Sequence, residues 1–181
     1  MRLSLVPSLA AMLLCTAPAL AVLPVGAAAP NFSTQASLGG KELPFELAAA
    51  LKKGPVVLYF YPAAFTKGCT IEAHDFADAT AKFKKLGATV IGVSADPIEK
   101  LDKFSVSECR SKFAVASATP QVIADYDVKL ATTTLASRTS YVIAPDGKVI
   151  FAYSAMDPTG HVEKTMAAVK EWNATHKHHA A

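Results

Sequence analysis

The chain has 181 residues, of which 51% are hydrophobic and 18% charged, with a formal net charge of +3. This length is enough for one domain with a hydrophobic core and is short for two. The composition excludes a disordered chain, a collagen-like chain and a repeat protein. The excess of positive charge is small and scattered, so we expect no nucleic-acid partner.

The cysteines exclude three further kinds of protein. Cys15, Cys69 and Cys109 are too few for a small scaffold built on disulfides. Their spacing contains no CxxC pair, which excludes a zinc knuckle and a dithiol oxidoreductase motif.

Residues 1–21 have the pattern of a secretory signal peptide. Arg2 gives a positive start, residues 3–14 form an apolar run, and Ala19 and Ala21 fit an A-x-A cleavage site. The apolar run is shorter than the roughly 20 residues that a membrane-spanning helix requires. We therefore expect no membrane span, cleavage after Ala21, and an exported protein that is periplasmic or secreted.

Residues 22–181 would then form a single domain, because they contain no repeat, low-complexity tract or linker. Cys69 and Cys109 would remain in a compartment where disulfides persist. Residues 174–181 are expected to be a mobile tail. This tail carries three histidines, with no cysteine or carboxylate beside them to complete a metal site, so we expect no metal. They are His176, His178 and His179.

The segment before Pro55 carries a turn signal at Gly39 and Gly40, which predicts an N-terminal hairpin. Residues 55–62 (PVVLYFYP) and 88–94 (ATVIGVS) are apolar runs typical of buried parallel strands. The stretch between these runs predicts a helix, with one apolar face and one solvated face. The apolar face holds Cys69, Ala73, Phe76, Thr80 and Phe83, and the solvated face holds His74, Asp78, Lys82 and Lys85.

The second half of the chain predicts more helices and a hairpin. A helix opens at residues 96–99 (DPIE), with an acidic cap and a proline at its first position, and extends to about Phe113. A short helix follows over residues 119–126. Two strands over residues 140–153 are joined by a PDGK turn, and a last helix covers residues 159–173. This order of elements predicts an α/β, thioredoxin-like fold with an N-terminal β-hairpin extension.

Cys69 is the candidate for chemistry, because it follows the helix-capping position at Thr66 by three residues. Free backbone N–H groups and the helix dipole favour a thiolate there. An ordinary cysteine thiol, with a pKa of about 8.5, is only a few per cent ionised at pH 7, and one helix end does not change this alone. Arg138, just before the strand TSYVIA, is the cation that the sequence offers. The alternative for Cys69 is a core thiol, against which the Lys67-Gly68 turn argues.

Pro62, Thr66 and Cys69 have the spacing PxxxTxxC, which resembles the active-site signature of the peroxiredoxins. YFYPAAFTKGCTIEAHDF, VIGVSAD and RTSYVIAPDGKV are similar to the Q-type, or bacterioferritin-comigratory, branch of that family. The resemblance covers about residues 29–172. It implies a thiol peroxidase that reduces hydrogen peroxide and small organic hydroperoxides without a metal, haem or flavin cofactor.

The resemblance also implies a role for each site residue. Cys69 would be the peroxidatic cysteine, whose thiolate attacks the peroxide and becomes a sulfenic acid. Thr66 would hold the peroxide, and Pro62 would shield the thiolate from water. Arg138 would stabilise the thiolate and the departing oxygen, with Glu72 orienting it. A thioredoxin-like protein or a small thiol would regenerate the enzyme, which we expect to be a monomer or a weak homodimer.

Two positions depart from the Q-type pattern. His74 stands five residues after Cys69, where that branch often carries its resolving cysteine, so the usual local disulfide cannot form. We expect His74 to be a surface residue paired with Asp78. Cys109, near the end of the helix predicted from residue 96, is either a resolving cysteine or a buried core thiol, and the sequence leaves both open. A disulfide would require Cα atoms within about 7 Å.

A different class of function is an exported thioredoxin-like protein that binds copper or acts as a redox chaperone, using Cys69 with a histidine. Such proteins usually carry two cysteines three residues apart, and that pair is missing. A disulfide reductase is opposed by the lack of CxxC. A scaffold without catalysis is opposed by the intact set of Pro62, Thr66, Cys69 and Arg138.

Overall fold

The computed structural model describes residues 22–176. The expected signal peptide with its cleavage point after Ala21, and the tail histidines His178 and His179, lie outside these residues. Within the described part of the chain, no helix is both long and apolar enough to span a membrane.

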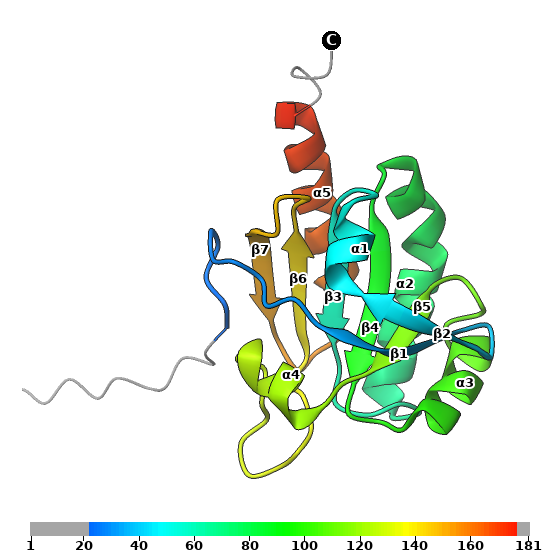
Figure 1. Cartoon of the computed structure of the whole chain (residues 1–181). Helices are drawn as coiled ribbons and strands as arrows, with labels where there is room; N and C mark the ends of the chain where they lie inside the picture. The colour runs from blue at the N-terminus through cyan, green and yellow to red at the C-terminus, as the bar shows by residue number, and fades with distance from the viewer. Residues whose placement is uncertain (1–21, 177–181) are drawn as a thin grey trace, which may run out of the picture.

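The described residues build one seven-stranded sheet with helices on both faces (Figure 1). The strand order across the sheet is β2-β1-β5-β4-β3-β6-β7. The strands are β1 (Ser33–Leu38), β2 (Lys41–Glu46), β3 (Val56–Phe60), β4 (Thr89–Ser94), β5 (Ala114–Ser117), β6 (Thr139–Ile143) and β7 (Val149–Ser154). The helices are α1 (Leu47–Leu51), α2 (Lys67–Lys85), α3 (Ile98–Ser107), α4 (Pro120–Asp125) and α5 (His161–His176).

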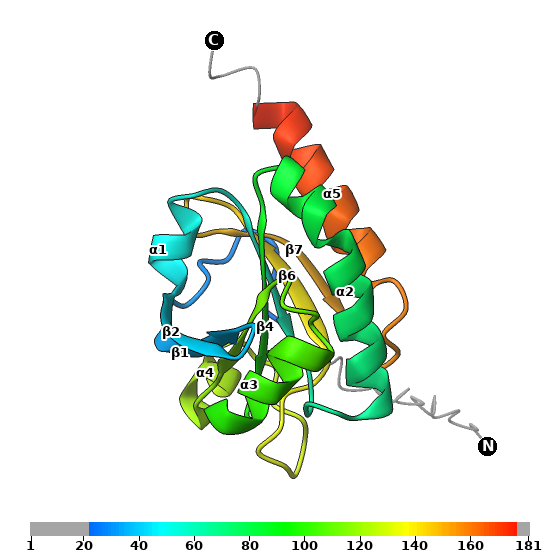
Figure 2. The ribbon, with the colours of Figure 1, turned by 90° about the vertical axis from the view of Figure 1, so that its right-hand side faces the viewer.

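The sheet separates two apolar cores. All five residues of β3 are buried, as expected of a strand covered on both faces. One core lies under α2, α3 and α5, where the ring of Tyr59 stacks on Phe76 with 4.3 Å between ring centroids. The other core lies under α1 and α4. Figure 2 shows α2 and α5 side by side on the first of these faces.

Several sequence predictions are confirmed by these elements. β1 and β2 form the expected antiparallel hairpin around Gly39 and Gly40, and β3 and β4 pair in parallel around α2. The expected apolar face of α2 is buried throughout its length, from Cys69 to Phe83. The expected PDGK turn joins β6 and β7.

The helix predicted from residue 96 is shorter in the structure than expected. It was expected to run from residue 96 to Phe113, but α3 spans Ile98–Ser107, and Pro97 is its N-cap, in extended conformation. Arg110 and Ser111 follow with φ angles of 49° and 54°, in the left-handed region that ends a right-handed helix. The chain then enters β5, a four-residue strand that the sequence analysis missed.

Two smaller boundaries also differ from the expectation. The five-residue helix α1 was not foreseen, because a stretch as short as Leu47–Leu51 carries too little periodicity to recognise. At the other end, α5 continues to His176, so residues 174–176 of the expected mobile tail are helical.

The pairing of β3 with β6 brings distant residues to one edge of the sheet. These strands are antiparallel, and Phe60 at the end of β3 faces Thr139 at the start of β6. Arg138 therefore lies beside the carboxyl end of β3, where the chain turns into α2. Carboxyl ends of parallel strands are the usual place for sites in α/β sheets.

Candidate active site

Cys69 lies at the start of α2, as the sequence predicts. Thr66 is the N-cap and Cys69 the third helical residue, so backbone N–H groups without a helical acceptor surround the sulfur. Cys69 is 1% exposed, and its thiol is free. The positive end of the helix dipole and these N–H groups favour negative charge on the sulfur.

Thr66 occupies the capping position without using its side chain as a cap. Its hydroxyl instead donates a hydrogen bond of 3.0 Å to the carbonyl of Ala63. The side chain is exposed, and its oxygen lone pairs remain available to accept a hydrogen bond.

The loop between β3 and α2 is fixed by contacts on both sides. The backbone N–H of Ala64 donates to Asp96 Oδ2 over 2.7 Å. Phe65 has a φ angle of 66°, which is unusual for a residue with a side chain, and its ring packs edge-on against Phe104. Pro62, at the start of this loop, is half-buried. The loop therefore carries local strain directly before the helix that presents Cys69.

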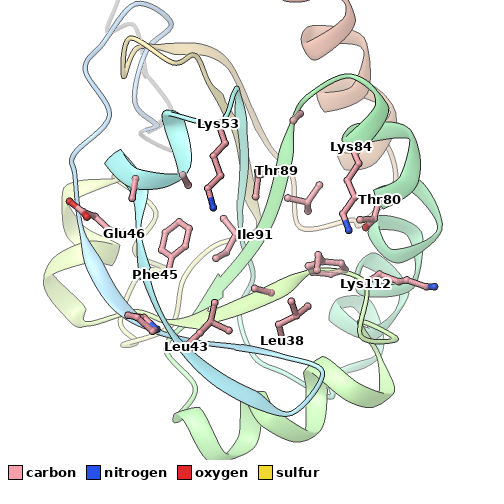
Figure 3. A pocket seen from close by; sticks show the side chains of 17 residues that line it. Leu38, Leu43, Phe45, Glu46, Lys53, Thr80, Lys84, Thr89, Ile91 and Lys112 are labelled. Carbon is pink, nitrogen blue, oxygen red and sulfur yellow. The ribbon is translucent and has the colours of Figure 1, made fainter.

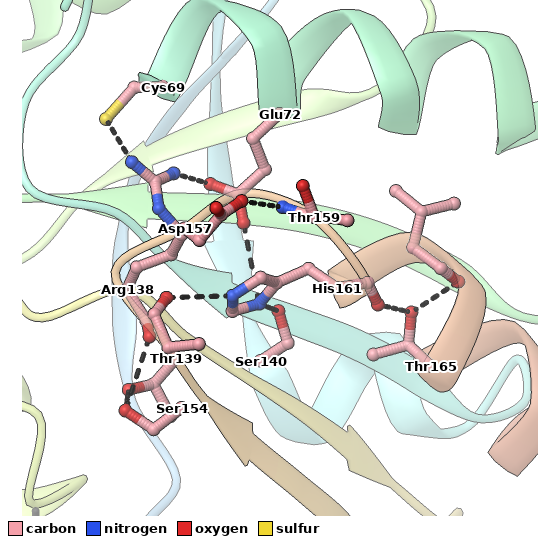
Figure 4. A network of polar contacts seen from close by, with 12 residues as sticks. Cys69, Glu72, Arg138, Thr139, Ser140, Ser154, Asp157, Thr159, His161 and Thr165 are labelled. Carbon is pink, nitrogen blue, oxygen red and sulfur yellow. Dashed lines mark hydrogen bonds and ion pairs between the residues drawn. The ribbon is translucent and has the colours of Figure 1, made fainter.

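Arg138 is buried, and each of its guanidinium nitrogens has an acceptor (Figure 4). Nε donates to the carbonyl of Met156 over 2.9 Å, and Nη1 donates to Glu72 Oε2. Nη2 lies 3.5 Å from Cys69 Sγ. Burial disfavours the charge, but Glu72 and Cys69 outweigh it and hold the pKa of Arg138 above its usual value. The structure thus places the predicted cation at the sulfur.

Glu72 lies one helical turn after Cys69 and is fully buried. Burial raises the pKa of Glu72 to about 8, although the charge and the hydrogen bond of Arg138 act in the opposite direction. Its Oε2 contacts Arg138, as the predicted orienting role requires, while its Oε1 has no hydrogen-bond partner.

Gly68 provides the space in which the guanidinium reaches the sulfur. A Cβ atom at this position would stand 2.9 Å from Arg138 Nη2. The sequence analysis treated Gly68 only as part of a turn. Glycine has a poor helix propensity, so its presence in the first turn of a predicted helix was a signal that this position needs space.

Asp96 also escaped the sequence analysis, which assigned it only as a helix cap. Its Oδ2 accepts from Ala64 N–H and from the Ser94 hydroxyl, and its Oδ1 pairs with Lys100 at 2.6 Å. Asp96 therefore ties the loop before Cys69 to the end of β4.

Cys109 lies two residues beyond the end of α3, rather than within the helix as expected. It is completely buried in the same apolar core as Cys69, and burial raises the pKa of its thiol far above the usual value. The thiol is free.

Two ion pairs fasten the segment around Cys109 to α2. His74 pairs with Glu108 at 2.9 Å, and Arg110 pairs with Asp78 at 2.7 Å. His74 is therefore a partly exposed, paired histidine, as predicted, but its partner is Glu108 and not Asp78.

The copper-binding alternative receives no support from the histidines. His74 is engaged with Glu108, and His176 stacks on Trp172 at the exposed end of α5. Over residues 22–176, no three or more histidine, cysteine, aspartate or glutamate side chains gather as a metal site would require. Lys67 is exposed at the first position of α2.

A groove lies toward the opposite end of α2 from Cys69 (Figure 3). It encloses about 370 Å³ between the N-terminal hairpin, α1, the C-terminal half of α2 and the starts of β4 and β5. Its lining includes Phe45, Ile91 and Lys84 but none of the predicted site residues. Hollow volume alone therefore does not locate the candidate site.

Replacing Gly68 with alanine tests whether the guanidinium must reach the sulfur. We expect the added methyl group to push Arg138 Nη2 away and to slow oxidation of Cys69 by hydrogen peroxide about tenfold, which is about 1.4 kcal/mol. Thermal stability should change little, because the better helix propensity of alanine, about 1 kcal/mol, offsets the weakened contact of Arg138 Nη2. Stopped-flow kinetics would measure the rate, with Lys67→Ala as the matched control in the same turn. An unchanged rate in Gly68→Ala would contradict this account.

Comparison with known proteins agrees with this geometry. Residues 25–152 match the AhpC/TSA family. The crystal structure of peroxidoxin BcpB from Mycobacterium tuberculosis superposes with a TM-score of 0.74 at 34% identity, covering 81% of this chain and 96% of that one. Chloroplastic peroxiredoxin Q of Oryza sativa subsp. japonica is 34% identical over 78% of this chain and 64% of its own length. Peroxiredoxin Bcp of Xanthomonas campestris is 29% identical over 64% of this chain and 76% of its own.

The structural match establishes the thioredoxin-like fold that the order of elements predicted, and the sequence matches agree with the resemblance to the Q-type branch. The chain therefore belongs to the AhpC/TSA family and is a peroxiredoxin, a thiol-dependent peroxidase.

Proposed function

We propose that Cys69 is the peroxidatic cysteine of this enzyme and that its substrates are hydrogen peroxide and small organic hydroperoxides. The observation that carries the proposal is the position of Cys69 Sγ at the start of α2, 3.5 Å from a buried guanidinium. The thiolate attacks one peroxide oxygen, an S–O bond forms, and the O–O bond breaks. Sulfur loses two electrons and becomes a sulfenic acid, and the departing oxygen takes a proton to leave as water or an alcohol.

The neighbouring residues support each stage of this step. Arg138 faces the sulfur and is oriented by Glu72, so its positive charge stabilises both the thiolate and the negative charge that moves to the departing oxygen. The exposed Thr66 hydroxyl, which donates to Ala63, has lone pairs free to accept from the peroxide. Pro62 offers no backbone N–H, which keeps this side of the loop poorly hydrated.

Access to Cys69 requires a local opening, because its side chain is buried. The loop of residues 62–66 is the part of the site that opens, since it is partly exposed and contains the strained backbone of Phe65. A molecule as small as hydrogen peroxide needs only a narrow passage.

Cys109 is the resolving cysteine in this proposal. Its thiol attacks the Cys69 sulfenic acid, an S–S bond forms, and water leaves. Because both sulfurs are buried, we expect the segment after α3 to leave its folded position before the disulfide forms. The left-handed backbone at Arg110 and Ser111 makes this segment a weak point of the fold. A thioredoxin-like protein or a small thiol then reduces the disulfide.

The setting of the enzyme is part of the same proposal. The positive start, apolar run and A-x-A motif of residues 1–21 support export to a periplasm or the outside of the cell. Within that compartment the enzyme works as a monomer or a weak homodimer.

Replacing Cys69 with serine should abolish peroxide consumption, because the serine hydroxyl does not form the nucleophilic anion at neutral pH. We expect at least a thousandfold loss of the rate with hydrogen peroxide and a thiol reductant, with an unchanged circular dichroism spectrum. Cys109→Ser serves as the control for loss of a buried thiol in a single turnover without reductant, where it should still consume one equivalent of peroxide through Cys69. Normal turnover in the Cys69 variant would refute the assignment.

Peroxide treatment should link Cys69 to Cys109, and digestion followed by mass spectrometry of the non-reduced protein would reveal the joined peptides. Cys109→Ser is expected to stop at a sulfenic or sulfinic acid on Cys69. Stable Cys69 sulfenic acid in the unmodified chain, without the linked peptides, would instead establish a cycle with one cysteine.

Expression of the full chain in a Gram-negative host tests the proposed export. We expect the protein in the periplasmic fraction with Val22 as its first residue, as measured by intact mass and N-terminal sequencing. Retention of residues 1–21 on a cytoplasmic product would contradict export.

A further inference from the structure

A buried histidine extends the polar cluster beyond Glu72 (Figure 4). His161 is the first residue of α5, and its side chain is 0% exposed. Its Nδ1 lies 3.6 Å from Glu72 Oε1, and its ring packs edge-on against Tyr153. The cluster thus runs from Cys69 through Arg138 and Glu72 to His161.

The hydrogen bonds of His161 determine where its proton lies. Nε2 is 3.0 Å from the carbonyl oxygen of Ala155, which can only accept, so Nε2 carries the hydrogen. Nδ1 is 2.8 Å from Ser140 Oγ and accepts from that hydroxyl in the neutral ring. Burial lowers the pKa of His161 to about 4, so the neutral form prevails near pH 7. The one lone pair on Nδ1 therefore has two neighbours, the Ser140 hydroxyl at 2.8 Å and Glu72 Oε1 at 3.6 Å.

The carboxyl group of Glu72 is only half satisfied. Oε2 accepts from Arg138, whereas Oε1 is buried without a hydrogen-bond partner. An ionised oxygen facing a ring nitrogen that has no hydrogen to donate is unfavourable, and a proton between the two atoms removes the conflict, with the Ser140 hydroxyl turning away from Nδ1. An approach of about 0.6 Å would bring Oε1 and Nδ1 to ordinary hydrogen-bond distance.

The charge of the cluster leads to the same conclusion. A Cys69 thiolate and a Glu72 carboxylate are two negative charges against the single positive charge of Arg138, all of them buried. An uncompensated buried charge is costly. A proton held at Glu72 and His161 makes the reduced cluster neutral. After oxidation the sulfur is uncharged, and Glu72 and Arg138 balance each other without that proton.

We propose that Glu72 and His161 together hold one proton while Cys69 is a thiolate and give it up when Cys69 is oxidised. This inference rests on the proposed function, because it assumes that Cys69 is the group that peroxide oxidises. His161 acts through Glu72 and does not touch the substrate, so it is a positioning residue for the proton.

The proton completes the balance of the peroxide step. The sulfur takes an OH group from the peroxide, and the other oxygen departs with the electron pair of the O–O bond. That oxygen needs one proton to leave as water or an alcohol, and the Glu72–His161 pair releases one at the same stage. Solution therefore supplies no net proton.

Other charged and titratable groups face this pair from the elements packed around it. Their charges remain fixed during the peroxide step near pH 7, because none of them is the group that reacts. Glu72 is faced by Arg138 before β6, Asp75 on α2 and Tyr59 on β3. His161 is faced by Arg138, by Tyr153 on β7, by Asp157 in the loop after β7 and by Lys164 on α5.

Infrared difference spectroscopy of the folded enzyme near pH 7 tests the proposal directly. The reduced protein should show the carbonyl band of a protonated carboxylic acid, which shifts in D2O and disappears when one equivalent of hydrogen peroxide oxidises Cys69. Glu72→Gln should lack the band, which assigns it. His161→Gln should weaken it strongly, because the amide does not replace the basic Nδ1.

Proton uptake measured with a pH indicator in weak buffer gives a second readout. Wild-type protein should take up almost no proton during a single oxidation, and Glu72→Gln should take up about one proton per Cys69 oxidised. His161→Gln should take up an intermediate amount, because burial alone already favours the protonated carboxyl group of Glu72. His74→Gln is the matched control, since His74 pairs with Glu108, and it should behave like wild type.

Three results would separate the possible failures. Absence of the band in reduced wild-type protein, or uptake of a full proton by wild type, would overturn the proton-holding pair. A band that stays at full strength in His161→Gln would overturn the part assigned to His161. Lack of oxidation of Cys69 by peroxide would instead overturn the proposed function, while the band in the reduced protein still tests the pair without peroxide.

Discussion

The contact between the Arg138 guanidinium and the Cys69 sulfur is the constraint on which the rest of the site depends. A planar guanidinium with several donors can face two acids and a carbonyl at once, which a lysine ammonium does less well. Met156, Glu72 and Cys69 use these donors, so the side chain is held from three directions. The register of β3 against β6 brings Arg138 beside the start of α2, where Cys69 lies.

Burial strengthens the electrostatic attraction in this contact and also makes any uncompensated charge unfavourable. Charges removed from water interact strongly, but each must be compensated. In the cluster the positive Arg138 lies between two acidic groups, Cys69 and Glu72, so one of the two acids has no countercharge when both are ionised. The pKa of Glu72, raised by burial, and the unpartnered Oε1 indicate that the carboxyl group is the place where the balance is least complete. Proton exchange at Glu72 is therefore the easiest way for the cluster to adjust its charge.

The sequence predicts those parts of the site that obey local rules. The capping position of Thr66 places Cys69 in the first turn of α2, and the steps of four and three residues to Ala73 and Phe76 keep these side chains on one buried face of that helix. Strong periodicity likewise predicts β3, β4 and α2. The end of α3 could not be predicted, because a left-handed backbone at Arg110 and Ser111 overrides a sequence pattern that continues to Phe113.

What the sequence does not reveal is set by contacts between distant segments. Gly68 matters because Arg138, 70 residues later, needs its space, and Asp96 matters because Ala64 donates to it. His161 becomes relevant only when α5 packs beside α2. Such residues have ordinary local roles as a turn, a cap or a core side chain, and only the folded chain reveals their second use. The same packing that buries Cys69 with these partners also hinders the access of peroxide to its sulfur. The reactivity of Cys69 therefore depends on how readily the strained loop before α2 opens.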